Sequence, residues 1–558
     1  MILLPTFLII ITFSVIGYGI IYSYIVDKEY LNQNIGVIGL VGCFFLIFIS
    51  YLTNIFTSHG YFHNIIILTI GLFSSFFYFI VIKKSYKNFF KNQKIILFIF
   101  FALLIGIFLH KSHDDFPSYH LPYTVNLVEN KLVYGLGNFN HGFRTPSSLF
   151  YLSSLFYLPV INYFSFHFSA FIIMFFSNII FVLNIIKFSK NNFLKFLCLF
   201  FFIFINIVFY RFAEHGTDRS GQIIVLLLIV YVLKIINDKK IVSNNVNFIL
   251  VLLAIMFTLK TYFLIYIIIL IPIYFKIKSK LKIKELFFNK QMIILILTGI
   301  FVLHVNFANT GCLIYPIKKL CFSKYSWSMS DQEVNRMSKH FEIWSKAGHT
   351  PNSRVENPKE YIKGFNWVSG WTKNYFFNKV SDTLLGVIAI FIFVFLFFLK
   401  NKWKSTKEEK FSYINLYIPI IFIFLYWFFY HPALRYGGFC ILAAIIFIPI
   451  SSILSKKKLN FADKKKFIFL LIIGALVFNI RNINRIEKEI TRYDYNILNN
   501  AYYFLPKAKY NKIQLKESII LNKPIHGACW NIKSPCTHRP DIEVKKKYSY
   551  LIYLNVKK

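Results

Sequence analysis

Long apolar segments, separated by short polar ones, recur along the whole chain. Most hold about 17–22 residues, the length that an α-helix needs to cross the hydrocarbon core of a bilayer. The pattern therefore predicts about fourteen membrane spans. They are expected near residues 4–25, 35–55, 62–82, 95–110, 163–186, 193–210, 220–236, 247–259, 260–275, 291–308, 381–399, 413–431, 438–454 and 467–481.

The stretch 247–275 is too short for two full spans, so a pair of short helices and a re-entrant hairpin both remain open.

Clusters of lysines lie in the loops between alternate apolar segments, as is typical of cytoplasmic loops. These loops are 83–94, 187–195, 234–246, 276–290, 400–411 and 455–466. The alternation then places the remaining connections, and both ends of the chain, on the external side. The external segments are 112–147, 211–219, the tip near Lys260, 309–380, 431–437 and 482–558.

The composition agrees with this topology, since 56% of the residues are hydrophobic, 20% aromatic and only 16% charged. A soluble fold of this composition would expose too much apolar surface, so we expect an all-α polytopic protein in a lipid bilayer. The net charge of +39 does not indicate nucleic-acid binding, because the lysines collect in the short loops between spans.

We expect one transmembrane domain over residues 1–481, with external loops 112–162 and 309–380, and a short external tail over 482–558. The first segment lacks the positive region and the cleavage site of a signal peptide, so it is expected to be a retained helix. The chain has no Gly-rich phosphate loop, which argues against an ATP-driven machine.

Three of the seven cysteines lie inside apolar segments, where we expect small core side chains. The other four form two local pairs in external segments. Their short spacings suit disulfide loops in an oxidising compartment better than a metal site. The pairs are Cys312 with Cys321 and Cys529 with Cys536.

Charged side chains stand out in three external places. The first is the loop after residue 110, where Asp114 and Asp115 precede an amphipathic stretch that begins at Tyr119 and His120. Ionisable residues beside lipid tend to be functional because their desolvation is costly. We expect a surface helix here with its apolar side in lipid. A solvated loop with two incidental aspartates is the alternative.

The second place is the turn 211–219, which carries Glu214, His215, Asp218 and Arg219. These charges form either an ion-paired helix cap or a second acidic wall facing Asp115. Hard oxygen ligands suit Mg²⁺ or Mn²⁺, so a divalent cation between the two walls is left open as a cofactor.

The third place combines Lys260, which interrupts an apolar run, with Arg435 and Tyr436 at the start of a late span. A guanidinium at that position can bind a phosphate through paired N–H donors. Lys260 is either a topological marker or a second cation for the same anionic group. Arg144, in the first loop, is a further candidate for a supporting role.

Two of these motifs resemble those of the GT-C superfamily, the membrane glycosyltransferases that use polyprenyl-phosphate-linked sugars. The run Asp115-Phe116-Pro117-Ser118-Tyr119-His120-Leu121-Pro122 is similar to their acidic motif in the first external loop. The run 431–436, ending in Arg435-Tyr436, is similar to their Arg-Tyr signature at the start of a late span.

The resemblance implies a GT-C-like bundle of about 12–14 spans with external juxtamembrane helices, in a bacterial inner membrane with the active face toward the periplasm. It implies an inverting transfer of a sugar from a polyprenyl-phosphate donor to a glycan or glycolipid acceptor. Asp115 would be the general base, with Asp114 beside it. Arg435, Lys260 and Tyr436 would bind the donor phosphate. The supporting residues would be Tyr119, His120, Arg144, Glu214, His215, Asp218 and Arg219.

The external loop 309–380 carries four tryptophans, which either stack on sugars or belong to the interfacial aromatic belt. We expect Trp327 and Trp344, which lie far from the span ends, to bind the acceptor.

Two other functions remain open. One is an O-antigen-type polymerase or ligase, which relies on external arginines and needs no catalytic aspartate. The other is a lipid-linked-sugar flippase, which should have charges along the middle of its spans, whereas these spans are almost free of charge.

Overall fold

In the computed structural model, the described residues are 2–81, 92–109, 111–186, 191–214, 216–238, 243–277, 289–348, 355–403, 413–460, 462–498, 508–539 and 542–555. All six predicted cytoplasmic loops include residues outside these ranges.

Within the described residues, nine helices are long and apolar enough to cross a membrane, and five apolar helices are shorter. Together they correspond one to one with the fourteen predicted segments. The nine are α1 (Leu3–Val26), α2 (Ile35–Phe56), α3 (Tyr61–Val81), α8 (Phe168–Ile186), α10 (Asp218–Asn237), α14 (Lys290–Thr310), α18 (Ser381–Phe397), α20 (Phe439–Ser455) and α21 (Asp463–Tyr493). The shorter five are α5 (Gln93–Leu104), α9 (Asn192–Val208), α11 (Ser243–Leu259), η8 (Thr261–Leu270) running into α12 (Ile271–Ile277), and α19 (Ile414–Tyr430). The chain is therefore a mostly helical, multi-pass membrane protein.

Several of these helices begin at an asparagine that caps them. Asn34, Asn191 and Asn289 each accept a hydrogen bond from the backbone N–H three residues later, at the starts of α2, α9 and α14. Asparagine is favoured at this position because its side chain satisfies one of the free N–H groups of the first turn. The polar residue before each apolar run thus fixes where the helix begins.

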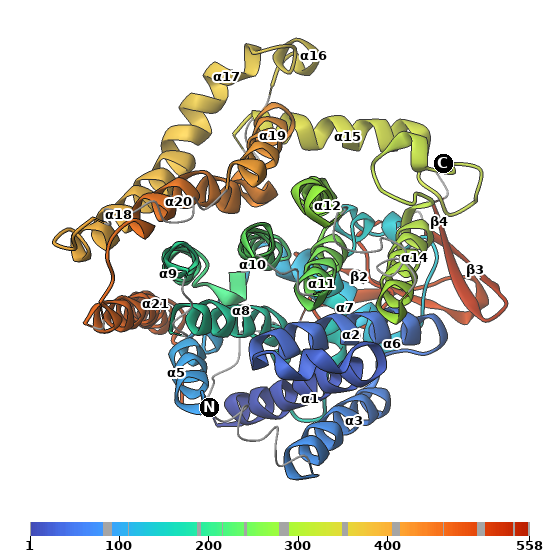
Figure 1. Cartoon of the computed structure of the whole chain (residues 1–558). Helices are drawn as coiled ribbons and strands as arrows, with labels where there is room; N and C mark the ends of the chain where they lie inside the picture. The colour runs from blue at the N-terminus through green and yellow to red at the C-terminus, as the bar shows by residue number, and fades with distance from the viewer. Residues whose placement is uncertain are drawn as a thin grey trace.

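The first three helices pack side by side (Figure 1). Gly17 of α1 faces Gly71 of α3 so closely that a Cβ on Gly17 would lie 1.8 Å from the Gly71 carbonyl oxygen. Small residues of this kind allow the backbones of membrane helices to approach each other. Helix α2 also packs against α8, which joins the three helices to the rest of the bundle.

Helix α18 is longer than one span at its N-terminal side. It continues from α17 (Asn366–Trp371) through the π-helical segment η10 (Thr372–Val380), and the whole apolar helix covers 32 residues. The last part of the predicted loop 309–380 is therefore helical and belongs to this element.

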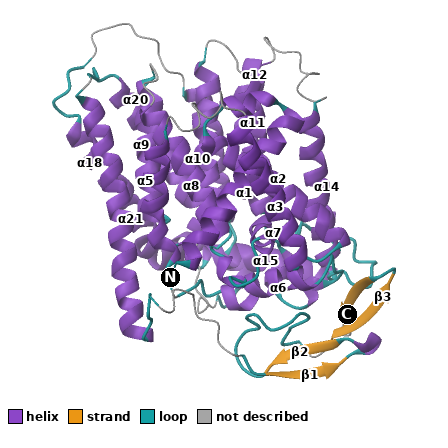
Figure 2. Cartoon of the chain, turned by 90° about the horizontal axis from the view of Figure 1, so that it is seen from below, coloured by secondary structure: helices purple, strands orange, loops and turns teal. Residues whose placement is uncertain are grey.

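The segments predicted to be external gather at one end of the bundle. Figure 2 shows the strands, α6 (Leu121–Glu129) and α15 (Asp331–Lys346) at that end, where both chain termini also lie. The other helices are α7 (Ser148–Leu155) and α16 (Pro358–Tyr361). Short helical turns are η1 (Lys28–Asn32), η2 (Ile105–Ile107), η3 (Phe116–His120), η4 (Leu136–Asn138), η5 (His141–Arg144), η6 (Tyr163–Ser165), η7 (Phe212–Glu214), η9 (Lys318–Leu320), η11 (Leu434–Gly438) and η12 (Lys516–Ser518).

The expected surface helix exists as α6, but its predicted placement in lipid is wrong. Its residues from Leu121 to Val128 are buried on every side. The backbone N–H of His59 donates to the Leu127 carbonyl at 2.9 Å on one side, and Ser534 of the tail binds Asn126 and Glu129 on another. Protein covers both faces because the tail folds back over this helix.

The tail contains strands, which an all-α prediction does not include. β1 (Tyr510–Gln514) pairs antiparallel with β2 (Ile520–Pro524), with Tyr510 opposite Pro524. β3 (Ile542–Lys547) pairs antiparallel with β4 (Tyr550–Asn555), with Ile542 opposite Asn555. Tyr134 extends the second pair, since its backbone exchanges hydrogen bonds with Leu551 and Tyr553. The tail is therefore attached to the first external loop.

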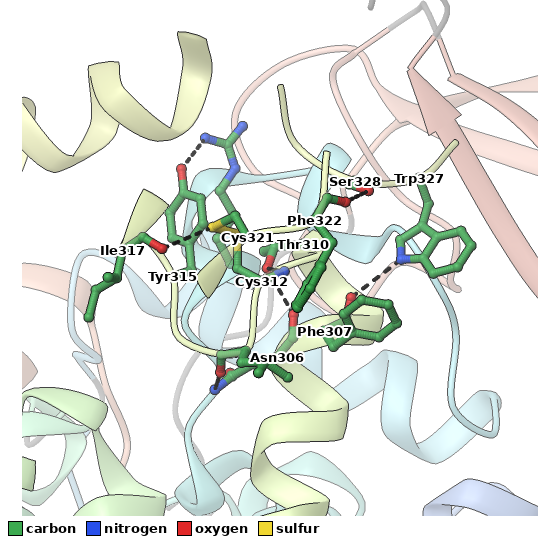
Figure 3. Close-up of a disulfide and its surroundings, with 12 residues drawn as sticks. Asn306, Phe307, Thr310, Cys312, Tyr315, Ile317, Cys321, Phe322, Trp327 and Ser328 are labelled. Carbon is green, nitrogen blue, oxygen red and sulfur yellow. Dashed lines mark hydrogen bonds between the residues drawn. A yellow bond between two sulfur atoms is a disulfide. The ribbon is translucent and has the colours of Figure 1, made fainter. Parts of the chain in front are cut away.

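The structure contains both disulfides that the cysteine spacing favours, Cys312–Cys321 and Cys529–Cys536. The first closes a small loop after α14, beside Tyr315 and Phe322 (Figure 3). The three remaining cysteines are free and buried in α2, α9 and α20.

Candidate functional site

The acidic loop folds into a turn that positions Asp115. Asp115 precedes the π-helical turn η3, so Tyr119, four residues later, lies over it and donates its hydroxyl proton to Asp115 Oδ2 at 2.8 Å. On the other side, the backbone N–H of Asp115 donates to His113 Nδ1 at 3.0 Å. The carboxylate retains 36% exposure and is held in one orientation.

Asp115 is ionised at neutral pH. Burial would raise the pKa of Asp115, but the charge that His113 acquires in acid, the hydrogen bond from Tyr119 and the charge of Arg435 together lower it below 3.8. Burial lowers the pKa of His120 to about 3 and also lowers the pKa of His113. At neutral pH a carboxylate therefore lies beside two neutral imidazoles.

The residues predicted to bind phosphate meet at one carboxylate. Asp218, at the start of α10, forms an ion pair through Oδ1 with Lys260, which lies between α11 and η8. Its Oδ2 accepts from Arg435 Nε at 2.8 Å. Asp218 is buried, so one acidic group lies between two cations at the end of the bundle. The alternative of a second acidic wall facing Asp115 does not hold for Asp218, because its two oxygens are bound by Arg435 and Lys260.

Aromatic rings complete this cationic cluster. Lys260 Nζ lies 5.1 Å from the centre of the Tyr436 ring, and Arg435 Cζ lies 5.5 Å from that of Trp344. Such contacts stabilise a cation where water is scarce. Of the two tryptophans expected to bind an acceptor, Trp344 borders the site. Trp327 instead packs among aromatic rings and donates to the Phe307 carbonyl at 3.3 Å (Figure 3).

The turn that carries Arg435 is held by side chains that the sequence did not single out. Gln222 of α10 donates to the carbonyls of Leu434 and Arg435 at 3.2 and 3.3 Å. Trp371 donates to the Pro432 carbonyl at 2.7 Å, and Tyr375 accepts from the Leu434 N–H at 2.9 Å. A glutamine inside an apolar span was the available signal for this role.

Gly437 follows Arg435 and Tyr436 at a position that favours glycine. Its φ is +85°, in the left-handed region, and a Cβ would lie 2.7 Å from the Tyr266 hydroxyl oxygen. The glycine therefore lets the chain turn sharply into α20, which fixes the direction of Arg435.

The acidic loop and the cationic cluster belong to one site. The charge of Arg435 contributes to lowering the pKa of Asp115. Burial lowers the pKa of Lys260, and both Asp218 and Asp115 oppose that change. Segments near residues 115, 218, 260 and 435, far apart in sequence, thus meet at the same end of the bundle.

Two of the predicted supporting residues hold the fold elsewhere. Arg144 is buried and donates to the Gly137 carbonyl, the Tyr315 hydroxyl and Glu333, which ties the first loop to α15 and to the disulfide loop after α14. Glu214 forms ion pairs with Arg211 and Arg485.

The remaining predicted residues have simpler surroundings. His120 is buried, and its ring stacks on that of His113 with 5.6 Å between the ring centres. Asp114 is exposed, and no described residue bonds to its carboxylate. His215 lies outside the described residues.

The described residues that could hold a metal ion all lie in the acidic loop, and not between Asp115 and the turn 211–219 as expected. His113, Asp115 and His120 each place one ligand atom within 4.8 Å of the others. Two imidazoles and one carboxylate suit Zn²⁺ or Mn²⁺ better than Mg²⁺. His113 Nδ1 already accepts the N–H of Asp115, however, and Asp115 Oδ2 already accepts the Tyr119 hydroxyl. A cation would have to compete with both hydrogen bonds.

The tail contacts the acidic loop directly. The Trp530 N–H donates to the Pro117 carbonyl at 3.0 Å, and the Trp530 ring packs edge-on against Phe116. Trp530 lies inside the loop closed by Cys529–Cys536. The disulfide loop therefore binds the acidic loop at Pro117, two residues after Asp115.

We expect the double substitution Cys529→Ser/Cys536→Ser to loosen this contact by about 2 kcal/mol, because the disulfide restricts the open state of its loop. The exchange rate of the Trp530 amide hydrogen should rise about 30-fold, as read by hydrogen–deuterium exchange mass spectrometry. The matched control, Cys312→Ser/Cys321→Ser, should leave that amide unchanged. Equal exchange in both variants would contradict the assigned role.

The fold and the site define a multi-pass helical membrane protein with, at one end of its bundle, a carboxylate and a cationic cluster that are close enough for their charges to act on each other. Residues 1–442 match the model of a family described as a domain of unknown function, DUF8201. The match covers more than half of the chain, so the chain belongs to this family. No curated protein and no solved structure matches it.

Proposed function

We propose that the protein is an inverting glycosyltransferase of the GT-C type. It would move a sugar from a polyprenyl-phosphate donor to a glycan or glycolipid acceptor at the external face of a bacterial inner membrane. The observation that carries this proposal is the convergence of Asp115 with the Asp218–Lys260–Arg435 cluster, since an ionised carboxylate and a cationic phosphate site are what such a transfer needs.

The charges of the cluster suit the donor. Lys260 and Arg435 carry two positive charges and Asp218 one negative charge, which leaves one positive charge. A polyprenyl phosphosugar is a phosphodiester with one negative charge. When the bond between the anomeric carbon and the phosphate oxygen breaks, the departing phosphate gains a second negative charge. Arg435 and Lys260 would stabilise that charge as it develops.

Asp115 would act on the other side of the sugar. The acceptor hydroxyl oxygen forms a bond to the anomeric carbon as the phosphate departs from the opposite face, so the configuration inverts. The hydroxyl proton passes to Asp115. Its low pKa makes Asp115 a weak base, but the attacking hydroxyl becomes strongly acidic as the oxygen–carbon bond forms. A weak base that is fully ionised is therefore sufficient.

This assignment predicts the pH dependence of transfer. The pKa of Asp115 lies below 3.8, so its carboxylate stays ionised as the pH falls from neutral to that value. The negative charge is lost only at lower pH. We expect kcat/KM of the purified protein to show no acidic limb between about pH 5 and 7. A limb near pH 6 that disappears in His113→Gln would assign the base to the imidazole instead.

The proposed function is tested in cells. Mass spectrometry would compare the envelope glycans and glycolipids of a strain lacking the protein with those of the same strain carrying the wild type or Asp115→Asn. Loss of one sugar in the deletion strain, restored only by the wild type, is the expected result. Full restoration by an Asp115→Asn protein that reaches the membrane in normal amounts would favour a polymerase, a ligase or a flippase.

A further inference from the structure

A second charged cluster, centred on Glu214, lies beside the proposed active site. Glu214 Oε2 accepts from Arg211 Nη1 at 2.9 Å, and its other oxygen accepts from Arg485 of α21. The pKa of Glu214 is lowered: burial opposes this, but the charges of Arg485, Arg211 and Arg219 outweigh it. Three guanidinium groups, two from the turn 211–219 and one from α21, therefore act on one carboxylate.

Positive charge is in excess here. Arg481 adds a fourth guanidinium, whose Cζ lies 4.0 Å from the centre of the Tyr210 ring. Glu489 adds one more carboxylate and accepts from Arg485 Nε at 3.1 Å. Four arginines thus share two glutamates. The Arg211 and Arg481 side chains reach solvent, but the Arg485 side chain is only 12% exposed. Uncompensated charge is costly in such a buried place, so this arrangement favours a bound anion.

Two guanidinium nitrogens have no partner to explain them. Nη1 of Arg219 and Nη1 of Arg485 are both buried, and neither donates a hydrogen bond to any described residue. In the described parts of the chain, the Arg219 side chain forms no hydrogen bond or ion pair at all. A buried donor without an acceptor is rare in folded proteins, and a binding site for a ligand is one accepted reason for it.

We propose that Arg211, Arg219 and Arg485 form a second anion site that binds a phosphate group. The planar guanidinium presents paired N–H donors that fit phosphate oxygens, and several of them can surround one tetrahedral anion. Burial and then the charge of Asp115 have the largest effects on the pKa of His113. Arg219 also lies close enough for its charge to lower that pKa. The second site therefore borders the Asp115 loop and is separate from the Asp218–Lys260–Arg435 cluster.

The position of the site indicates where the phosphate comes from. Arg211 follows the end of α9, Arg219 lies in the first turn of α10, and Arg481 and Arg485 lie beyond the apolar part of α21. The ends of spans are at the level of lipid headgroups, and basic pockets between spans bind them. A phospholipid headgroup and a free phosphate ion share the required chemistry. The proposal does not rest on the transferase assignment.

The first experiment measures thermal unfolding of the purified full chain in a neutral detergent. Inorganic phosphate is titrated against sodium chloride at constant ionic strength, for the wild type, Arg219→Gln and the control Arg492→Gln. Arg492 is an exposed arginine at the far end of α21. We expect phosphate to raise the unfolding temperature of the wild type and the control, with an apparent affinity about tenfold weaker in Arg219→Gln.

Misfolding would not mimic this result. Arg219 donates to no described residue, so its replacement breaks no hydrogen bond within the described part of the chain. The phosphate-free Arg219→Gln protein should unfold at the wild-type temperature or above it, because an unpaired cation has been removed. An identical phosphate response in the wild type and Arg219→Gln would overturn the proposal. The proposal would also fail if the wild type neither responded to phosphate in detergent nor retained lipid in the experiment below.

A second experiment separates the two sources of phosphate. Native mass spectrometry counts the phosphatidylglycerol molecules retained from mixed micelles by the wild type and by Arg219→Gln. Retention of a lipid by the wild type but not by the variant identifies a headgroup as the ligand. A response to inorganic phosphate without lipid retention identifies a soluble phosphate instead. The difference between the wild type and Arg219→Gln should persist when both carry Arg435→Gln, which removes a cation of the other cluster, so a failed transferase assignment would not be confused with a failed second site.

Discussion

Asp115→Asn is expected to lower the rate of sugar transfer by about 10²–10⁴-fold, the usual contribution of a general base. Asparagine has nearly the same size and can still accept the hydroxyl proton of Tyr119, which Asp115 Oδ2 accepts at 2.8 Å in the wild type. It cannot take a proton from an acceptor hydroxyl. The measurement is single-turnover transfer of a radiolabelled sugar from a polyprenyl-phosphate donor by the purified protein.

Asp114→Asn provides the matched control. The neighbouring carboxylate is exposed, and no described residue bonds to it. We expect this variant to transfer sugar within about threefold of the wild type, because a solvated carboxylate contributes little orientation. If both aspartates tolerate substitution, the base lies elsewhere. If both variants lose transfer equally, the effect belongs to the charge of the loop and not to Asp115.

Arg435→Gln is expected to lower transfer by about 10²–10³-fold, because it removes one donor to the departing phosphate. The substitution also leaves Asp218 with Lys260 as its only cationic partner. Loss of an ion-pair partner in a buried place destabilises the fold, so the single variant alone cannot separate catalysis from folding.

The double variant Asp218→Asn/Arg435→Gln separates the two effects. Removing both charges leaves one cation, Lys260, where Asp218→Asn leaves two uncompensated cations, so we expect its unfolding temperature to be higher than that of Asp218→Asn. Its transfer rate should remain as low as that of Arg435→Gln. Recovery of transfer together with stability would show that Arg435 acts only through the fold.

The membrane helices could be read from the sequence, because the length and continuity of an apolar run depend on local residues alone. Other features depend on partners far along the chain. The polar strands β1 and β3 carry lysines and give no alternating apolar pattern, and β4 pairs with Tyr134, more than 400 residues before it. The burial of α6 could not be read either, because the tail that covers it is distant in sequence.

The site could be predicted only in part, because some of its features depend on residues that are distant in sequence. Arg435 and Lys260 stood out as charges at span ends, whereas the role of Asp218 depends on both of them meeting it in space. Gln222 and Tyr375 bind the backbone of the Arg435 turn, and apart from the polar Gln222 inside an apolar span the sequence gives no sign of these contacts. The contacts of Arg144 with Gly137, Tyr315 and Glu333 could not be predicted either, because two of these partners lie far along the chain.

The helix that ends as α18 extends well beyond the roughly 20 residues that cross a bilayer. Its lipid-facing part carries exposed Leu385 and Ile392, and its protruding part holds the Arg435 turn through Trp371 and Tyr375. A helix adapts to a thicker or thinner membrane by changing its tilt. One continuous helix thus joins a surface that faces lipid to the turn that carries Arg435, so a change in its tilt would move both.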